Sequence, residues 1–522
     1  MMIHVRQILS PILFLVCVLS AWRSAAQTKP NVLVIYTDDH RFTGIRALGY
    51  QDVDTPNIDA LVNNGVAYSQ TYLMGAFHGA TCMPSRAMLM TGRNLFELGN
   101  LGHSIPTTHT TMGEAFRDQG YYSYIIGKWH QDQESLRRTF NAGTKIMGLG
   151  LYLTDHYRMP LWDYQSAKGL DKSNAYLLKY VKGDTVRVPF DPKLKRGPFG
   201  TENTGPHTSE LFANEAVKFF ENYKKKDPFF MYLAFQAPHD PRQAPQKYRD
   251  RYPVDKMKLM PSYSSEHPFD NGDMFLRDEE LAPWPRTPEV ARQELADYYA
   301  IITHLDAQIG KVVAALKANG QYENTLIVLA GDSGLAVGNH GLLGKQNIYD
   351  EDGIHVPFIV SGALVKDKGR RVDSFGYIHD IFPTVCDYAG IPIPSSVTGK
   401  SLWPAAGEGV TPVRGYTYHA YKQFQRAYRK GDYKLIEYVK APEIDPKTKE
   451  VSLKGSRVTQ LFNIKKDPWE TLNLSIFPEH FERLHEMQAG LKQAAIENHD
   501  DNKLIGYPYN FWDFYELTKP CE

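Results

Sequence analysis

The stretch NVLVIYTDD, residues 31–39, decides the fold that this sequence predicts. Its apolar and β-branched residues form a short continuous run, which is typical of a strand buried on both faces of a parallel sheet. The run ends in two acidic residues, Asp38 and Asp39. The stretch therefore predicts a buried parallel strand that carries two carboxylates to one edge of its sheet.

Amphipathic helical segments and short apolar runs alternate after this strand. A capped helix, TPNIDALVNNG, follows first. Three helix–strand pairs come next: TTMGEAFRDQG with YYSYIIGKWH, SELFANEAVKFFENYKK with PFFMYLAFQAPHDP, and ELADYYAIITHLDAQIGKVVAALKANG with NTLIVLAGDSG. This alternation predicts an α/β domain over 27–400, with a large, mostly parallel sheet sandwiched by helices.

The pattern changes after residue 400. Short alternating runs separated by turns (VRGYTYHAY, FQRAYRKGDYKLIEYV and VTQLFNIKKDPWETLNL) predict a small antiparallel sheet, and HFERLHEMQAGLKQAAIEN predicts a closing amphipathic helix. We expect 401–522 to be a smaller C-terminal α+β domain that contributes to the substrate pocket.

Charge and leader sequence restrict the partners and the compartment. Basic and acidic residues number 59 each, so no overall field directs the chain to nucleic acid or to an anionic membrane. Residues 1–26 combine basic residues, an apolar run and small residues, which predicts a secretory signal cleaved after Ala26. A membrane anchor is the alternative, but the run is short and Pro11 interrupts it. We expect export to a periplasm or beyond, and no stable membrane anchor.

Polar residues follow four of the predicted strands. They are Asp38 and Asp39, then Lys128 and His130 in GKWH, His239 in APHDP, and Asp332 in GDSG. In an open α/β sheet, ligands bind beyond the carboxyl ends of the strands. Carboxylates gathered there would repel one another unless a divalent cation lay between them, and oxygen ligands suit Ca²⁺ or Mg²⁺. Taken singly, each residue could instead be a helix cap, a turn residue or a structural histidine.

Residues 82–86, CMPSR, match the C-x-P-S-R signature of the type I sulfatases, within the alkaline phosphatase superfamily. The resemblance extends over most of the chain, because NVLVIYTDDHR, TPNIDAL, CMPSRAMLMTGR, GYYSYIIGKWH, APHDP and HGLLGKQNIYDE occur in the family's order. It implies that Cys82 is oxidised during export to formylglycine, the catalytic aldehyde. It also implies a partner that performs this conversion, a formylglycine-generating or sulfatase-maturing enzyme.

The physical chemistry of the Cys82 segment agrees with the resemblance. Pro84 is tolerated at the start of a helix, so Cys82 is expected at a helix N-terminus, where free N–H groups favour an anion. Arg86 follows four residues later on the same helical face. Two other interpretations of Cys82 stay open: an ordinary thiolate nucleophile, and a buried structural cysteine.

The resemblance assigns roles to the other residues. Asp38, Asp39, Asp332 and residue 82 would hold the cation, Ca²⁺ or, as the alternative, Mg²⁺. Lys128, Lys345 and Arg86 would offset the charge of the sulfate oxygens. His239 would protonate the leaving alcohol, and His130 would take a proton from the aldehyde hydrate so that sulfate is expelled. The family has Asn or His after its late metal aspartate; here Ser333 stands there, a weaker candidate ligand.

The substrate is less well defined than the reaction. Long segments at 131–207 and 240–290 are expected to shape the pocket. Their aromatic residues and histidines suit sugar rings: Tyr152, His156, Tyr157, Trp162, His207, His267 and Trp284. We expect a hydrolase that removes sulfate from a sulfated carbohydrate. The alternatives are an aryl or small-alcohol sulfatase, and a phosphonate or phosphodiester hydrolase of the same superfamily.

Overall fold

The computed structural model describes residues 29–50, 52–150, 155–166, 168–169, 171–191, 193, 205–403, 412–444, 447–448, 451–453, 455–500 and 509–515. The predicted signal, 1–26, lies outside the described residues. In the described ranges, no helix has both the length and the apolar character that crossing a membrane requires.

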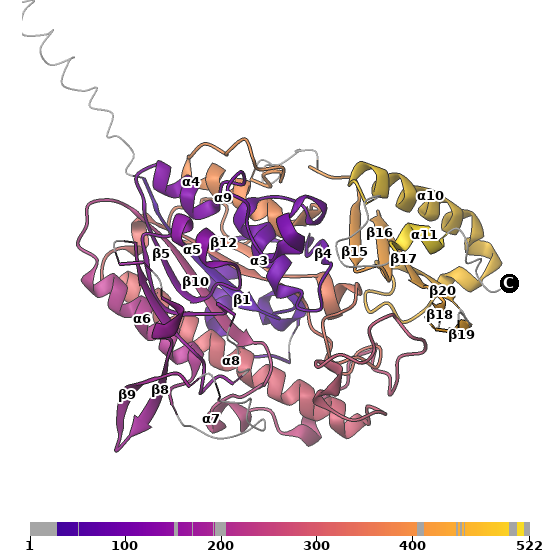
Figure 1. Ribbon diagram of the computed structural model, residues 1–522, viewed down its shortest axis with the longest axis horizontal. Helices are drawn as coiled ribbons and strands as arrows, with labels where there is room; N and C mark the ends of the chain where they lie inside the picture. Colours follow the sequence, from indigo (N-terminus) through magenta and orange to yellow (C-terminus); the bar gives the residue numbers. More distant parts are fainter. Residues whose placement is uncertain are drawn as a thin grey trace, which may run out of the picture.

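A large sheet forms the centre of the molecule, as Figure 1 shows. It has nine strands in the described part of the chain. Strand β1 (Asn31–Asp38) pairs in parallel with β10 (Phe229–Pro238) on one side and with β11 (Thr325–Gly331) on the other. Strand β5 (Tyr122–Lys128) extends the parallel set beyond β10. The remaining strands are β6 (Ala142–Met147), β7 (Trp162–Gln165), β12 (Phe358–Ser361), β2 (Gly65–Tyr68) and β13 (Arg370–Val372). The predicted large, mostly parallel sheet is confirmed, with antiparallel pairs at β11–β12, β12–β2 and β6–β7.

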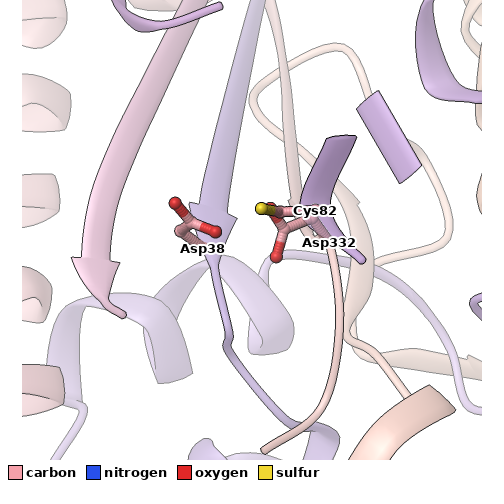
Figure 2. A group of neighbouring side chains, drawn as sticks. All are labelled: Asp38, Cys82 and Asp332. Carbon is pink, nitrogen blue, oxygen red and sulfur yellow. The ribbon is translucent and has the colours of Figure 1, made fainter. Parts of the chain in front are cut away.

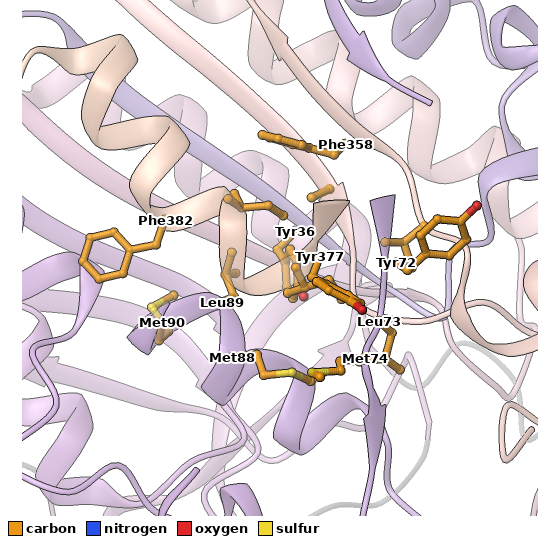
Figure 3. Packing of buried hydrophobic residues seen from close by; sticks show 14 of the residues in the cluster. Tyr36, Tyr72, Leu73, Met74, Met88, Leu89, Met90, Phe358, Tyr377 and Phe382 are labelled. Atoms are coloured by element: carbon orange, nitrogen blue, oxygen red, sulfur yellow. The ribbon is translucent and has the colours of Figure 1, made fainter. Parts of the chain in front are cut away.

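Helices cover both faces of this sheet because alternate residues of β1 enter two hydrophobic clusters. Val32, Val34 and Tyr36 pack with α3 (Cys82–Thr91), α4 (Met112–Asp118) and α9 (Ile381–Ala389). Figure 3 shows part of that cluster. Leu33 and Ile35 pack instead with α2 (Pro56–Asn63), α6 (Thr208–Asn222) and α8 (Pro288–Ala318). Helices therefore cover both faces of the sheet. A ligand can bind beyond the carboxyl ends of its strands, which the helices leave uncovered.

A second, smaller sheet lies beside the large one (Figure 1). Its strands β15 (Thr417–Tyr421), β16 (Gln425–Lys430), β17 (Tyr433–Lys440) and β20 (Ser456–Asn463) are antiparallel, and α10 (Phe481–Glu497) packs on them. A fifth strand, β4 (Gly75–Ala76), comes from the other end of the chain and pairs in parallel with β15. Sequence patterns gave no indication of this pairing.

Short elements complete the described chain. They are β3 (Thr71–Tyr72), β14 (Gly376–Tyr377), β8 (Tyr176–Val181), β9 (Asp184–Pro189), β18 (Glu443–Ile444), β19 (Val451–Leu453), α5 (Gln133–Thr139), α7 (Gln246–Arg249) and α11 (Phe511–Tyr515).

A buried ionic cluster joins the smaller sheet to the loop that follows β11. Lys434 of β17 is fully buried, and its Nζ lies 2.6 Å from Asp350 Oδ1 and 2.7 Å from Glu470 Oε1. Arg429 of β16 also donates to Asp350, at 2.7 Å. The cluster fixes the position of this loop, because every one of these charges has an opposite charge within hydrogen-bonding distance.

Lys434→Met is expected to lower the free energy of unfolding by about 3–5 kcal/mol, because it leaves two buried carboxylates with less positive charge. The matched control is Lys430→Met, in which an exposed lysine loses only a 4.0 Å pairing with Glu486 and stability should change by less than about 0.5 kcal/mol. Denaturant unfolding of both variants measures the difference. Equal stability of the two would contradict the role of Lys434.

Candidate active site

The carboxyl ends of the central strands bring the predicted site residues together. Asp38 ends β1, Lys128 ends β5, His239 follows β10 and Asp332 follows β11. Figure 2 shows Asp38, Cys82 and Asp332 side by side at this edge. The contacts described below place all ten predicted residues in one group: Asp38, Asp39, Cys82, Arg86, Lys128, His130, His239, Asp332, Ser333 and Lys345.

Cys82 is the first residue of α3, and all ten residues of this helix are buried. Its Sγ lies 3.4 Å from His130 Nδ1 and 3.5 Å from Lys128 Nζ. Arg86, one turn later, directs Nη2 to Asp332 Oδ2 at 2.9 Å and lies 3.6 Å from Asp38 Oδ2. Helix α3 thus delivers a sulfur atom and a guanidinium to the same edge of the sheet, as predicted.

The surroundings of Cys82 favour the protonated form of its thiol. Burial raises the pKa of the Cys82 thiol to about 11, although Lys128 and Lys345 act in the opposite direction. Nucleophilic cysteines have lowered pKa values, because the thiolate is the reactive form. Both described cysteines, Cys82 and Cys386, are free and buried. Burial therefore disfavours the thiolate form of an unmodified Cys82 in the absence of a cation.

The carboxylates form a cluster that fits a divalent cation. Asp38 Oδ2 pairs with Lys128, but its buried Oδ1 has no hydrogen-bond partner in the described part of the chain. One ligand atom each from Asp38, Cys82 and Asp332 lie within 4.8 Å of one another, and the same holds for Asp38, Asp39 and His239. Burial and the charge of Asp38 raise the pKa of Asp332 well above its usual value. Oxygen donors gathered in this way suit Ca²⁺ or Mg²⁺.

Asp39 is held in an unusual backbone conformation, with φ at 61°. Its N–H donates to Asp332 Oδ1 at 2.8 Å, and the Tyr298 hydroxyl donates to its carbonyl oxygen at 2.8 Å. Its carboxylate receives Lys345 Nζ at 2.5 and 2.7 Å and the Ser333 hydroxyl at 3.0 Å. A non-glycine residue at positive φ costs energy, and these bonds keep it in place. Ser333 reaches the cluster, and its role as a metal ligand stays a prediction.

Two histidines lie beside the cluster: His130, which is half-buried, and His239, which is buried. Burial and the charge of Lys128 lower the pKa of His130 well below its usual value, and burial with Lys345 does the same for His239. His239 Nδ1 lies 2.8 Å from the main-chain oxygen of Asp240, so Nδ1 carries the proton of the neutral ring. Nε2 is then directed toward Asp39 Oδ2, 3.7 Å away. His130 contacts the Cys82 sulfur, whereas His239 lies beside the Asp39 carboxylate.

The comparison with protein families shows the family of this chain. The Sulfatase family matches residues 30–391, and the C-terminal region of N-sulphoglucosamine sulphohydrolase matches 338–499. The chain belongs to the sulfatase family. It is accordingly a sulfuric ester hydrolase, as the resemblance in sequence implied.

Relatives and solved structures agree with this assignment. An arylsulfatase of Clostridium perfringens is 28% identical over 499 residues, covering 92% of this sulfatase and 98% of the relative. An N-acetylglucosamine-6-O-sulfatase of Bacteroides thetaiotaomicron is 23% identical over 517 residues, covering 91% and 88%. A solved structure in complex with its substrate D-glucosamine-2-N,6-O-disulfate has the same fold, with a TM-score of 0.67, 21% identity and coverage of 91% and 99%.

A cavity of about 310 Å³ opens onto the cluster of this sulfatase. Cys82, Lys128, His130, His239 and Lys345 line its inner half. Sequence reasoning missed the rest of its wall, which is formed by Gly79, Ala80, Leu276, Arg277, Asp278 and Gln346. The missed charged residues lie in the irregular segment 240–290, where no periodic pattern marks single positions.

The aromatic residues that were expected to shape the pocket do not line this cavity, where the structure describes them. Trp162 packs in the hydrophobic core, and His156 and His207 stack on each other at 4.6 Å. His156 Nε2 lies 3.0 Å from the main-chain oxygen of His239. This hydrogen bond helps to fix the backbone of His239. Tyr152 lies outside the described residues. Burial in the core accounts for Trp162, and stacking on each other accounts for His156 and His207.

Proposed function

We propose that this sulfatase removes sulfate from a sulfated carbohydrate, with Cys82 converted to formylglycine and a cation, Ca²⁺ or Mg²⁺, held by Asp38, Asp39, Asp332 and residue 82. Ser333 is a fifth candidate ligand. The convergence of the Cys82 helix with the three carboxylates carries the proposal. The relative that acts on N-acetylglucosamine 6-O-sulfate supports the carbohydrate class.

Within this proposal the chain's own residues neutralise and position the sulfate. When present, the formylglycine supplies a nucleophilic hydroxyl, and the cation supplies positive charge to the sulfate oxygens. Arg86, Lys128 and Lys345 are buried beside the cluster and add three further positive charges. Fixed charges in a buried site stabilise developing negative charge without reorganisation, so this arrangement favours cleavage of an S–O bond.

The two histidines divide the proton transfers. His130 Nδ1, beside the Cys82 sulfur, is placed to accept a proton from the side chain of residue 82. His239 lines the cavity, where the alcohol part of the ester must leave; with a second proton on Nε2, which the bound anionic ester would favour, it would protonate the leaving oxygen. His130 beside residue 82 and His239 beside Asp39 would thus serve as one base and one acid.

His239→Ala is expected to reduce the rate on a sulfated sugar by about 10³-fold, but on 4-nitrophenyl sulfate by about 10-fold or less. A sugar hydroxyl is a poor leaving group that needs a proton, whereas nitrophenolate is not. His130→Ala serves as the comparison and should impair both substrates equally, because its step follows departure of the alcohol. Steady-state rates of sulfate release measure both. Equal losses on the two substrates for His239→Ala would show that another residue is the general acid, with Lys345 as the next candidate.

A panel of sulfated saccharides, with free sulfate as readout, tests the substrate class. Aryl sulfates, phosphonate esters and phosphodiesters run alongside, because the arylsulfatase relative and the shared superfamily make these the rival substrates. Cleavage of aryl sulfates without any sulfated saccharide would overturn the carbohydrate proposal and leave the sulfatase assignment intact. A preference for a phosphonate ester would overturn the reaction class as well.

The proposal extends to compartment, maturation and domain organisation. Export directed by residues 1–26 would expose the enzyme to glycans outside the cytoplasm, and a formylglycine-generating or sulfatase-maturing enzyme would convert Cys82. Residues 27–400 would form the catalytic domain, and 401–522 would contribute to the pocket. Lys422 supports the last point, because its Nζ would lie only 3.9 Å from a Cβ atom placed on Gly79, a residue of the cavity wall.

A further inference from the structure

The outer wall of the active-site cavity is a fixed structure. Glu279, in the 3-10 helix Glu279–Leu281, accepts hydrogen bonds from the backbone N–H of Leu343 at 3.0 Å and of Gly344 at 2.8 Å. It also pairs with Arg286 at 3.0 Å. These bonds attach the segment around residue 278 to the loop that carries Lys345. The residues of the wall are therefore positioned before a substrate arrives.

Asp278 is a residue of this wall, and its carboxylate accepts fewer hydrogen bonds from neighbouring residues than it can. Its side chain is only 7% exposed and lines the cavity that contains Cys82. Oδ1 accepts from Arg277, and Oδ2 accepts from Gln346 Nε2 at 2.8 Å. Asp278 also directly precedes the 3-10 helix, but its side chain makes no capping bond. A carboxylate has about four acceptor sites, so about two of those of Asp278 are not used by these two bonds.

The inner half of the cavity, at the cluster, and the outer half, at residues 276–278, differ in net charge. In the inner half, Arg86, Lys128 and Lys345 balance Asp38, Asp39 and Asp332, and a bound divalent cation would add two positive charges. In the outer half, Arg277 and Asp278 line the cavity, and Arg277 pairs with Asp278 and also with Asp240 behind the lining, so this group of three carries one net negative charge. The nearby Lys422 is paired with Asp273 and adds no net charge. The inner half thus suits an anion, and the outer half does not.

We propose that Asp278 selects the sugar, by accepting hydrogen bonds from hydroxyl groups beside the sulfate ester and by excluding a ring that carries a second anionic group there. This inference rests on the proposed carbohydrate sulfatase function. A buried acceptor that is fixed by Arg277 and Gln346 rejects a ligand that lacks the matching donor, and a like charge adds repulsion. The cavity volume of about 310 Å³ is at the small end for ligand sites, which suits one sugar ring.

Asp278→Asn tests the inference, because it keeps the shape of the side chain and removes its charge. The probes are the monosulfates of galactose and of N-acetylglucosamine, then the best of them against its disulfated counterpart, and 4-nitrophenyl sulfate. The matched control is Asp270→Asn. Asp270 lies on the same segment as Asp278, is exposed, and pairs with Lys440 of β17, so the substitution removes an equal charge away from the cavity. The measured quantity is kcat/KM for sulfate release.

The wild-type enzyme should prefer the monosulfate by about 100-fold. Asp278→Asn should lower kcat/KM on that monosulfate by about 30-fold, reduce the preference to below about 10-fold, and change aryl sulfate turnover by less than about 3-fold. Asp270→Asn should change none of these. Equal losses on the sugar and the aryl sulfate would show a merely structural role and overturn the inference. So would wild-type preference for the disulfated sugar.

The test separates the two levels of proposal. If sulfated sugars are cleaved and Asp278→Asn behaves like the wild-type enzyme, only the selection by Asp278 is wrong. If aryl sulfates are cleaved but no sulfated sugar is, the carbohydrate proposal itself is wrong and the inference falls with it.

Discussion

Cys82→Ala is expected to reduce sulfate release by about 10⁴-fold or more, while the protein stays folded. Removing the nucleophile of a covalent mechanism has effects of this size, because the remaining groups bind the ester without opening a reaction path. The substitution deletes one buried sulfur atom at the first residue of α3, where no disulfide is lost. Circular dichroism should therefore match the wild-type protein, and rates on several sulfate esters should fall together.

The second buried cysteine provides the control. Cys386→Ala removes the same atom from α9, inside the hydrophobic core, and should lower stability while leaving the rate per folded molecule unchanged. Peptide mass spectrometry of the wild-type enzyme should show residue 82 as formylglycine and residue 386 as cysteine. Active enzyme that contains only unmodified Cys82 would refute the modification and restore the thiol as a candidate nucleophile.

Asp38→Asn is expected to lower activity by about 10³-fold or more and to abolish stabilisation by Ca²⁺. Burial alone would raise the pKa of Asp38, but Lys128 and Arg86 hold it well below its usual value, so the carboxylate is charged at neutral pH. A ligand at about 100 times its Kd stabilises the folded state by about 2.7 kcal/mol. Chelation should lower the Tm of the wild-type enzyme, and added Ca²⁺ should restore it. The variant should show neither change.

Asp306→Asn is the matched control for this experiment. Asp306 is equally buried, but it accepts from the backbone N–H of Ile58 at 2.7 Å, outside the cluster. The control variant should lose stability and keep both its activity and its response to Ca²⁺. Full activity of the wild-type enzyme after exhaustive chelation would contradict the metal site, and so would an unchanged Ca²⁺ response in Asp38→Asn.

The parts of the site on regular elements could be predicted from sequence, because strand and helix geometry is periodic. Apolar runs that end in polar residues placed Asp38, Lys128, His239 and Asp332 at one edge of the sheet, where the structure has them. The spacing of four residues likewise placed Arg86 on the face of α3 that carries Cys82.

Other features depend on contacts that no local pattern encodes. Asp278 reaches the cavity because Glu279 fixes its segment to a loop 65 residues later in the chain. The aromatic residues that were expected to shape the pocket did not mark the wall of this cavity where the structure describes them, since burial in the core and sugar stacking favour the same residue types. Strand β4 has only two residues, Gly75 and Ala76, which is too short for any alternation to show.

The pairing of β4 with β15 bears on the timing of biosynthesis. Cys82 follows β4 by six residues, and the strand obtains its partner only from β15. The His419 side chain in β15 also contacts the carbonyl oxygen of Leu73, 346 residues earlier in the chain. While the ribosome is still making the intervening chain, the segment before Cys82 has no strand to pair with, and α3 lacks part of its final surroundings. Because Cys82 is only 2% exposed in the finished protein, the proposed maturing enzyme would have its best access to the thiol during this interval.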